Sequence, residues 1–181
     1  DFTMAFDREV PLLPVFVWFY ILAFPFWAVG YLLAARRGKD MFYRFVATDL
    51  TIHFICFICF ILIPTTNIRP EIPGNTLSEK ILALVYSLDG GNSPSNLFPS
   101  IHCYVSWMCW KGVEGSEKVP KWYQRFSLVF AILIIISTQV LKQHYIVDAA
   151  AALLLVEFFW RFYQKGQRHK WVVHVFAHKK K

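Results

Sequence analysis

The chain has 181 residues, of which 56% are hydrophobic and 17% are charged, and its formal net charge is +7. Soluble domains carry about 25% charged residues, and here the charges are also grouped between long apolar runs, so an ordinary soluble domain is excluded. The length suits one domain, and the pattern predicts an all-α, polytopic bundle of membrane helices. Basic residues in such a chain are typical of cytoplasmic loops and of contacts with lipid headgroups, so we expect membrane lipids and no nucleic acid as partners.

Five apolar stretches are candidate spans, at residues 15–35, 41–63, 97–112, 126–141 and 145–163. The third is short for a hydrocarbon layer of about 30 Å, so we expect it to start inside the protein. Residues 81–88 form a still shorter apolar run, which is predicted to be a re-entrant or interfacial segment that the protein buries. The count leaves open a sixth span before residue 1, and residues 1–181 are expected to form a single transmembrane domain.

The loop charges predict how the spans are oriented. Lys and Arg exceed Asp and Glu in the loops after the first and third spans, and the tail at 164–181 is basic and holds no acid. The N-terminal segment and the loop at 66–98 are instead rich in acids. The positive-inside rule places the basic loops and the tail in the cytoplasm. We therefore expect a multi-pass protein of the cell membrane with loop 66–98, residues 99–102 and the corner at 142–145 together on the external side.

Two histidines and a carboxylate lie on that predicted external side. His144 and Asp148 are four residues apart at the start of the last span, which puts both on one helical face. A carboxylate there can accept a hydrogen bond from one ring nitrogen and leave the other nitrogen free as a nucleophile. His102 opens the third span and is a candidate general acid for a displacement at phosphorus. Arg69 offers a forked donor to an anionic pair of oxygens.

Three motifs in this part of the chain resemble the conserved boxes of the type 2 phosphatidic acid phosphatase (PAP2) superfamily. Residues 99–102, Pro-Ser-Ile-His, are similar to its PSGH box, and Arg69 with the following proline is similar to the end of its K-x6-RP box. The stretch from Ser137 through His144 to Asp148 has the spacing of its SR-x5-H-x3-D box. The boxes occur in the order of the family, and the resemblance extends over about residues 60–160.

The chain departs from the boxes where the family has a lysine, a glycine and an arginine, because it holds Leu62, Ile101 and Thr138 there. Two cations that would bind phosphate are therefore replaced, and Lys142 and Lys80 are candidates to substitute for them. These losses, together with the stretch KQHYIVD, also resemble the lipid phosphotransferase branch that includes the sphingomyelin and inositol phosphorylceramide synthases. Members of that branch move a phospho-headgroup onto an alcohol instead of onto water.

The resemblance implies a metal-independent mechanism with no cofactor. His144 would attack phosphorus while Asp148 orients its ring, and His102 would protonate the leaving oxygen. The developing negative charge can be met by cationic side chains and amide dipoles, so no metal ion is required. A second reaction with water or an alcohol would then release the phosphohistidine.

Four residues are candidate phosphate ligands: Arg69, Ser100 and Ser137 under the same resemblance, and Lys142 as a substitute for a missing cation. Ser137 has the alternative of bonding back within its own helix. Lys142 has the alternative of extending its amine to the membrane interface.

The expected function is that of a membrane lipid phosphatase, which hydrolyses a phosphomonoester or diphosphate of a lipid through a phosphohistidine. A lipid phosphotransferase with an alcohol acceptor is one alternative. A non-catalytic scaffold or transporter with the same fold is another, favoured by the losses at Leu62 and Thr138 and opposed by the intact histidines. The identity of the lipid and the oligomeric state are left open.

Overall fold

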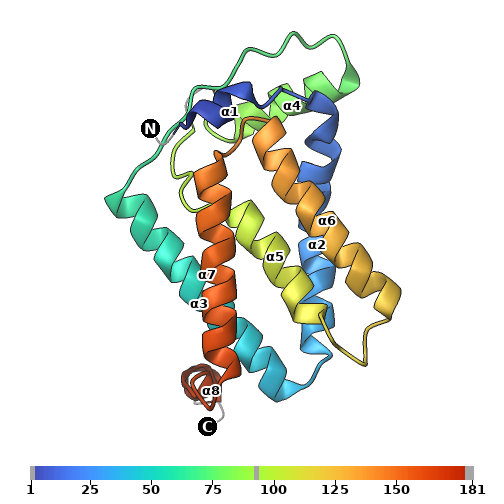
Figure 1. The fold of residues 1–181 in the computed structure, drawn as a ribbon, viewed down its shortest axis with the longest axis vertical. Coiled ribbons are helices and arrows are strands. Elements are labelled where there is room, and N and C mark those ends of the chain that lie inside the picture. Colours follow the sequence, from blue (N-terminus) through green and yellow to red (C-terminus); the bar gives the residue numbers. More distant parts are fainter. Residues whose placement is uncertain (1–2, 92–93, 178–181) are drawn as a thin grey trace.

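The computed structural model describes residues 3–91 and 94–177, and these residues fold into helices joined by loops (Figure 1). The described elements are α1 (Ala5–Glu9), the short 3-10 helix η1 (Pro14–Phe16), α2 (Val17–Ala35), α3 (Lys39–Leu62), α4 (Leu77–Leu88), α5 (Ile101–Val113), α6 (Lys121–Val140), α7 (Ile146–Gln164) and α8 (Lys170–Ala177). Extended backbone within the described ranges pairs at one isolated bridge, between Thr66 and Ser95. The prediction of an all-α helical bundle is confirmed.

Five helices cover the five apolar stretches predicted as spans. These are α2, α3, α5, α6 and α7, and the largest shift of a boundary is at the start of α6, which begins at Lys121 instead of residue 126. The helix α5 packs against α2, α3, α6 and α7, so the shortest of the five lies at the centre of the bundle. Its N-cap residue, Ser100, is fully buried, which shows that α5 starts inside the protein.

Three helical segments of the described residues are long and apolar enough to cross a membrane, and they identify the chain as a membrane protein: Pro14–Ala35, Lys39–Leu62 and Lys121–Val140. The helix α7 has 19 residues but includes Asp148, Glu157 and Arg161. The 13 residues of α5 reach only about 20 Å at 1.5 Å per residue, less than a hydrocarbon layer of about 30 Å. The helices α5 and α7 are not among these three segments, so the count of five spans stays a prediction.

The bundle has two different ends (Figure 1). The upper end in that view, called the α4 end below, holds α1, α4, the long segment between α3 and α4, and the corner between α6 and α7. The opposite end, called the α8 end, holds α8 and the connections from α2 to α3 and from α5 to α6. The acidic segments thus gather at one end and the basic loops at the other. Residues 92–93 of the predicted loop 66–98 and residues 178–181 of the predicted tail 164–181 lie outside the described residues.

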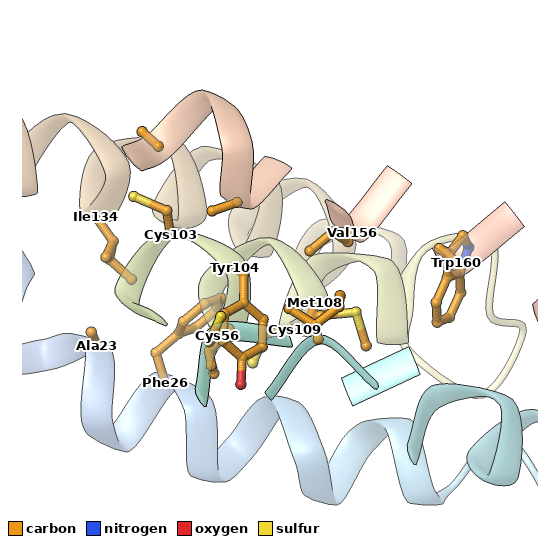
Figure 2. Packing of buried hydrophobic residues seen from close by; sticks show 14 of the residues in the cluster. Ala23, Phe26, Cys56, Cys103, Tyr104, Met108, Cys109, Ile134, Val156 and Trp160 are labelled. Carbon is orange, nitrogen blue, oxygen red and sulfur yellow. The ribbon is translucent and has the colours of Figure 1, made fainter. Parts of the chain in front are cut away.

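The main hydrophobic core surrounds α5 (Figure 2). Side chains of α5 are fully buried there against residues of the four surrounding helices, and the cluster includes Ala23, Phe26, Cys56, Cys103, Tyr104, Met108, Cys109, Ile134 and Val156. The closest approach is at Gly30 of α2, where a Cβ atom would lie 2.6 Å from Sγ of Cys109. Glycine therefore lets α2 pack directly on α5, which fixes the first span against the helix that follows Ser100.

A smaller core holds α4 against the α4 end of the bundle. It consists of Val17, Tyr20, Leu82, Tyr86 and Leu141. The hydroxyl of Tyr86 also donates a hydrogen bond to the carbonyl of Leu141 at 2.6 Å. Residues 81–88, predicted as a buried re-entrant or interfacial segment, thus form most of a helix that packs on α2 and on the end of α6.

Candidate active site

A cavity of about 260 Å³ lies at the α4 end, between α2, the segment that precedes α5, and the α6–α7 corner. His102 and His144 both line it. The rest of the wall consists of aromatic side chains of α2 and of residues from the 89–101 segment, including Asp89 and Asn96. Residues from distant parts of the sequence therefore share one small space, and we call it the histidine cavity.

The start of α5 sets the position of His102. Oγ of Ser100 accepts a hydrogen bond from the backbone N–H of Cys103 at 3.3 Å, which caps the first turn of the helix. The backbone N–H of Ser100 donates to the carbonyl of Asp148 at 3.3 Å, so the start of α5 is bonded to the start of α7. The hydroxyl of Ser100 is buried within this cap, and the residue does not line the cavity.

His102 lies against the aromatic side chains of α2. Its ring stacks on Tyr20 with the centroids 4.3 Å apart and an interplanar angle of 20°. The rings of Trp27 and Phe24 follow, with centroid distances of 5.1 and 5.9 Å. Nε2 of His102 is buried and makes no hydrogen bond within the described residues. A buried polar atom without a partner is uncommon and indicates a site for a ligand or a water molecule.

The second histidine is held by the α6–α7 corner. The backbone N–H of His144 donates to the carbonyl of Thr138 at 3.1 Å, and its Nδ1 lies 3.5 Å from Oδ2 of Asp148. Asp148 is 1% exposed, and its Oδ2 also accepts a hydrogen bond from the backbone N–H of Tyr145 at 2.9 Å. The ring centroids of His102 and His144 are 6.3 Å apart. The structure thus brings the three residues assigned to catalysis into one constellation, with the carboxylate behind His144.

Arg69 lies beside the histidine cavity and does not line it. Its Nη1 donates to the carbonyls of Asp89 at 2.9 Å and of Gly91 at 3.0 Å, and its Nη2 donates to Oδ2 of Asp89 at 2.5 Å and to Oε1 of Gln143. The guanidinium also lies over the ring of Tyr86, 4.6 Å from its centroid. The side chain is fully buried. Arg69 therefore joins the end of α4 to the residue that precedes His144.

A sequence comparison covers most of the chain. A profile of the PAP2 superfamily matches residues 3–161. The chain belongs to the PAP2 superfamily. A search of curated proteins and a search of solved structures found no match. Membership supports a phosphatase-type phosphoesterase fold, in a superfamily that consists generally of phosphatases and phosphotransferases.

Lys142 and Ser137, two further residues predicted to bind phosphate, donate instead to backbone carbonyls. Nζ of Lys142 donates to the carbonyl of Asp7 at 2.8 Å and to that of Val10 at 2.5 Å, so it bonds the corner to the N-terminal segment. Partial burial lowers the pKa of this amine. Oγ of Ser137 is fully buried and donates to the carbonyl of Ile134 at 2.6 Å. The structure does not bring either side chain to the cavity.

No described lysine or arginine takes the place of the two cations that this PAP2 chain lacks at Leu62 and Thr138. Leu62 ends α3 with an exposed side chain, and the hydroxyl of Thr138 donates to the carbonyl of Ile135 at 2.8 Å. Lys80 is an exposed residue of α4 and does not line the cavity. None of the described residues that line the cavity is a lysine or an arginine. The histidine cavity is therefore poor in positive charge for a site in a phosphoesterase fold.

Sequence reasoning missed the aromatic side of this PAP2 cavity. Tyr20, Phe24 and Trp27 of α2 line it, and composition did not separate them from the many aromatic residues expected to face lipid. Their spacing of four and three residues places them on one helical face, which was the one signal that could have identified them. Asp89 and Gln143 were missed too, because their importance comes from their contacts with Arg69.

Proposed function

We propose that this PAP2 protein is a membrane lipid phosphatase that hydrolyses a phosphomonoester or diphosphate of a lipid through a phosphohistidine at His144. The observation that carries the proposal is the pair of imidazoles in one cavity, 6.3 Å apart between ring centroids, with Asp148 behind one of them. A phosphoryl group between the two rings has a nucleophile on one side and a proton donor on the other, as in-line displacement requires.

The first chemical step uses Nε2 of His144. Nδ1 lies 3.5 Å from Oδ2 of Asp148 and makes no hydrogen bond within the described residues. In this proposal the gap closes when substrate binds, so that the carboxylate holds the tautomer with its proton on Nδ1 and a lone pair on Nε2. Nε2 forms a bond to phosphorus while the bond from phosphorus to the lipid oxygen breaks. The leaving oxygen takes a proton from His102, so the products are the lipid alcohol, a neutral His102 and phosphohistidine.

The second step reverses the role of His102. A water molecule attacks the phosphohistidine, His102 accepts its proton, and the bond between phosphorus and Nε2 breaks. Inorganic phosphate leaves, and both histidines return to their starting states. No step requires a metal ion, and activity in the presence of a chelator tests this point.

In this scheme the candidate phosphate ligands mainly hold the segments that carry the two histidines. Nη2 of Arg69 can contact the substrate by exchanging the carboxylate of Asp89 for a phosphoryl oxygen, because it already donates to that carboxylate, whereas Nε makes no hydrogen bond within the described residues. Ser100 holds the start of α5 through its capping bond. Lys142 and Ser137 support the corner and the end of α6 through their bonds to backbone carbonyls.

The cation-poor cavity favours a second candidate, a lipid phosphotransferase. A phosphomonoester carries a charge of about −1.5 to −2 at pH 7, whereas a phosphodiester carries a single negative charge and needs fewer cations around it. The described lining offers no lysine or arginine. Under this alternative the same phosphohistidine forms from a phosphodiester lipid, keeps the headgroup, and passes it to the hydroxyl of an acceptor.

The test uses purified protein in lipid nanodiscs with a panel of lipid phosphates and phosphodiesters, with and without chelator. Free phosphate and new lipids are measured together, and His144→Ala is the matched inactive variant. Phosphate release that survives chelator and is lost in the variant supports the phosphatase. A new lipid that carries the headgroup, without phosphate release, selects the phosphotransferase. No product from any substrate, with folded protein, contradicts both and supports the non-catalytic alternative.

A further inference from the structure

A second feature of the molecule lies at the α8 end, away from the histidine cavity. The outer face of α7 carries a groove of about 400 Å³ lined by Leu154, Glu157, Phe158, Arg161, Phe162, Lys165 and the nearby Arg168. Three of these seven residues are cations and three are large apolar side chains. The apolar part lies along the helix and the cations gather where the helix ends. We call this feature the α7 groove.

The three cations are exposed and close to the apolar wall. The guanidinium of Arg168 lies over the ring of Phe162, 4.3 Å from its centroid, so its charge is held at the edge of the groove. Arg161 is 77% exposed and meets Glu157 at 3.4 Å. Lys165 follows the last residue of α7. A headgroup at this point would face three positive charges from one turn of helix and the loop after it.

The one acid in the groove is also paired from the inside of the bundle, with Lys111, which itself meets Glu114 at 3.3 Å. Oε1 of Glu157 lies 2.9 Å from Nζ of Lys111 and accepts a hydrogen bond from Nε1 of Trp107 at 2.9 Å. Arg161 therefore shares its partner with Lys111. The groove keeps a net positive charge, which makes it complementary to an anion.

The apolar part of the groove continues toward the middle of the bundle. Leu154 and Phe158 also line a second, almost wholly apolar groove of about 400 Å³ between α3 and α7, together with Ile55, Cys59 and Ala151. From Leu154 to Lys165, α7 rises about 17 Å, close to half of a hydrocarbon layer of about 30 Å. Both Leu154 and Phe158 are exposed, at 70% and 63%. The surface thus has the length and polarity of a lipid in one leaflet.

We propose that the α7 groove binds an anionic membrane phospholipid. Its phosphate lies among Arg161, Lys165 and Arg168, and an acyl chain follows Phe158 and Leu154 into the groove between α3 and α7. Basic pockets beside membrane helices bind the headgroups of anionic lipids in this way. The site is separate from the histidine cavity, so this proposal can be tested independently of the proposed reaction.

The first experiment measures lipid binding to the full chain by native mass spectrometry. Phosphatidylglycerol and phosphatidylcholine of the same chain length are compared on the wild type and on the triple variant R161Q/K165Q/R168Q. Each cation near the surface contributes about 1 kcal/mol to the binding of anionic lipid, so we expect the triple variant to lose roughly 100-fold in affinity for phosphatidylglycerol and little for phosphatidylcholine.

The matched control is K118Q/K121Q/R125Q, which removes three exposed cations at the same end but outside the groove. It should bind phosphatidylglycerol as the wild type does. Equal loss in both triple variants would show a general effect of net charge and would overturn the site.

The second experiment separates a lipid from a free anion. Inorganic phosphate is added as a competitor, and Leu154→Ala with Phe158→Ala shortens the apolar wall. We expect no displacement by phosphate and weaker binding of both lipids to the double variant. Displacement of the lipid by phosphate, or equal lipid affinity of the wild type and the double variant, would show that the groove is a simple anion site and would contradict the proposal.

Discussion

The carboxylate of Asp148 faces two groups with one oxygen: Oδ2 lies 3.5 Å from Nδ1 of His144 and accepts the backbone N–H of Tyr145 at 2.9 Å. The second contact caps the first turn of α7. The cap fixes the rotamer of the side chain, and the fixed rotamer places the oxygen against the imidazole. The orientation of His144 is therefore tied to the start of the last long helix.

Asp148→Asn tests the orienting role of the carboxylate. The amide oxygen can still accept the capping bond, so the helix should form normally. The amide can no longer stabilise the proton on Nδ1 of His144, so we expect turnover to fall roughly 100- to 10,000-fold. Initial rates and thermal unfolding should be measured on the same preparation. A wild-type rate in Asp148→Asn would show that Asp148 has no role in the mechanism. If Asp148→Asn does not fold, the assay is repeated with Asp148→Glu.

The two histidines should differ in their dependence on the leaving group. A lipid alkoxide needs a proton to leave, whereas a nitrophenolate does not. His102→Asn should therefore slow lipid phosphate hydrolysis roughly 100- to 10,000-fold but still allow a burst of nitrophenolate from nitrophenyl phosphate. His144→Ala should abolish both reactions. Equal effects of the two variants on the two substrates would contradict the assigned roles.

The phosphoenzyme offers a direct readout of the same assignment. With a radiolabelled nitrophenyl phosphate, His102→Asn should accumulate acid-labile label on the protein, because the second step lacks its base. The label should be absent from His144→Ala. Label that persists in His144→Ala would place the nucleophile elsewhere.

Arg69→Lys tests whether Arg69 is a structural clamp. A lysine keeps the charge but cannot reach two backbone carbonyls, a carboxylate and an amide at once. We expect the free energy of unfolding to fall by about 2 kcal/mol or more, with a loss of turnover that follows the loosening of the α6–α7 corner. The exposed Arg36→Lys is the matched control and should change neither quantity. Lost turnover with unchanged stability would instead make Arg69 a direct ligand of the substrate.

Tyr31→Phe tests a polar contact inside the bundle. The hydroxyl of Tyr31 in α2 donates to Oδ1 of Asp49 in α3 at 2.7 Å, and Asp49 is 9% exposed. Loss of the hydroxyl leaves a buried carboxylate oxygen short of a donor, so stability should fall by about 1–3 kcal/mol while turnover is retained. Tyr43→Phe is the control, because the hydroxyl of Tyr43 makes no hydrogen bond within the described residues. Equal stability of the two variants would show that the contact with Asp49 is not needed for stability.

Much of the fold could be predicted because the apolar runs of the sequence determine where the long helices lie. The boundaries of α2, α3 and α7 lie within a few residues of the predicted spans, since apolar runs of that length have few other stable arrangements in a membrane. The late start of α5 followed from its short length. The start of α6 was misplaced because residues 121–125 include Lys121, Gln124 and Arg125, which interrupt the apolar run but do not prevent helix formation.

The candidate site was only partly predictable. His144 and Asp148 were predicted to share one helical face, but α7 begins at Ile146 and His144 lies in the corner before it. The two residues still meet, because the turn before α7 brings Nδ1 of His144 to 3.5 Å from Oδ2 of Asp148. The orientation of Lys142 and Ser137 depends on backbone carbonyls that any sequence would provide. Arg69 also meets the side chains of Asp89 and Gln143, which come from distant parts of the chain. The aromatic wall from α2 depends on how two helices rotate against each other, which local sequence does not determine.

The contacts of Lys142 also determine when the N-terminal segment can dock on the α6–α7 corner during synthesis of the chain. Its amine bonds to the carbonyls of Asp7 and Val10, and the carboxylate of Asp7 accepts the backbone N–H of Ile146 at 2.9 Å. The partners are separated by more than 130 residues along the chain. A ribosome makes residues 7–10 before residues 142–146, so these contacts can form only after the residues between them have been made. The corner that carries His144 therefore reaches its final arrangement only after α6 and the start of α7 have been made, so under the proposed function a chain that stops before α7 has no activity.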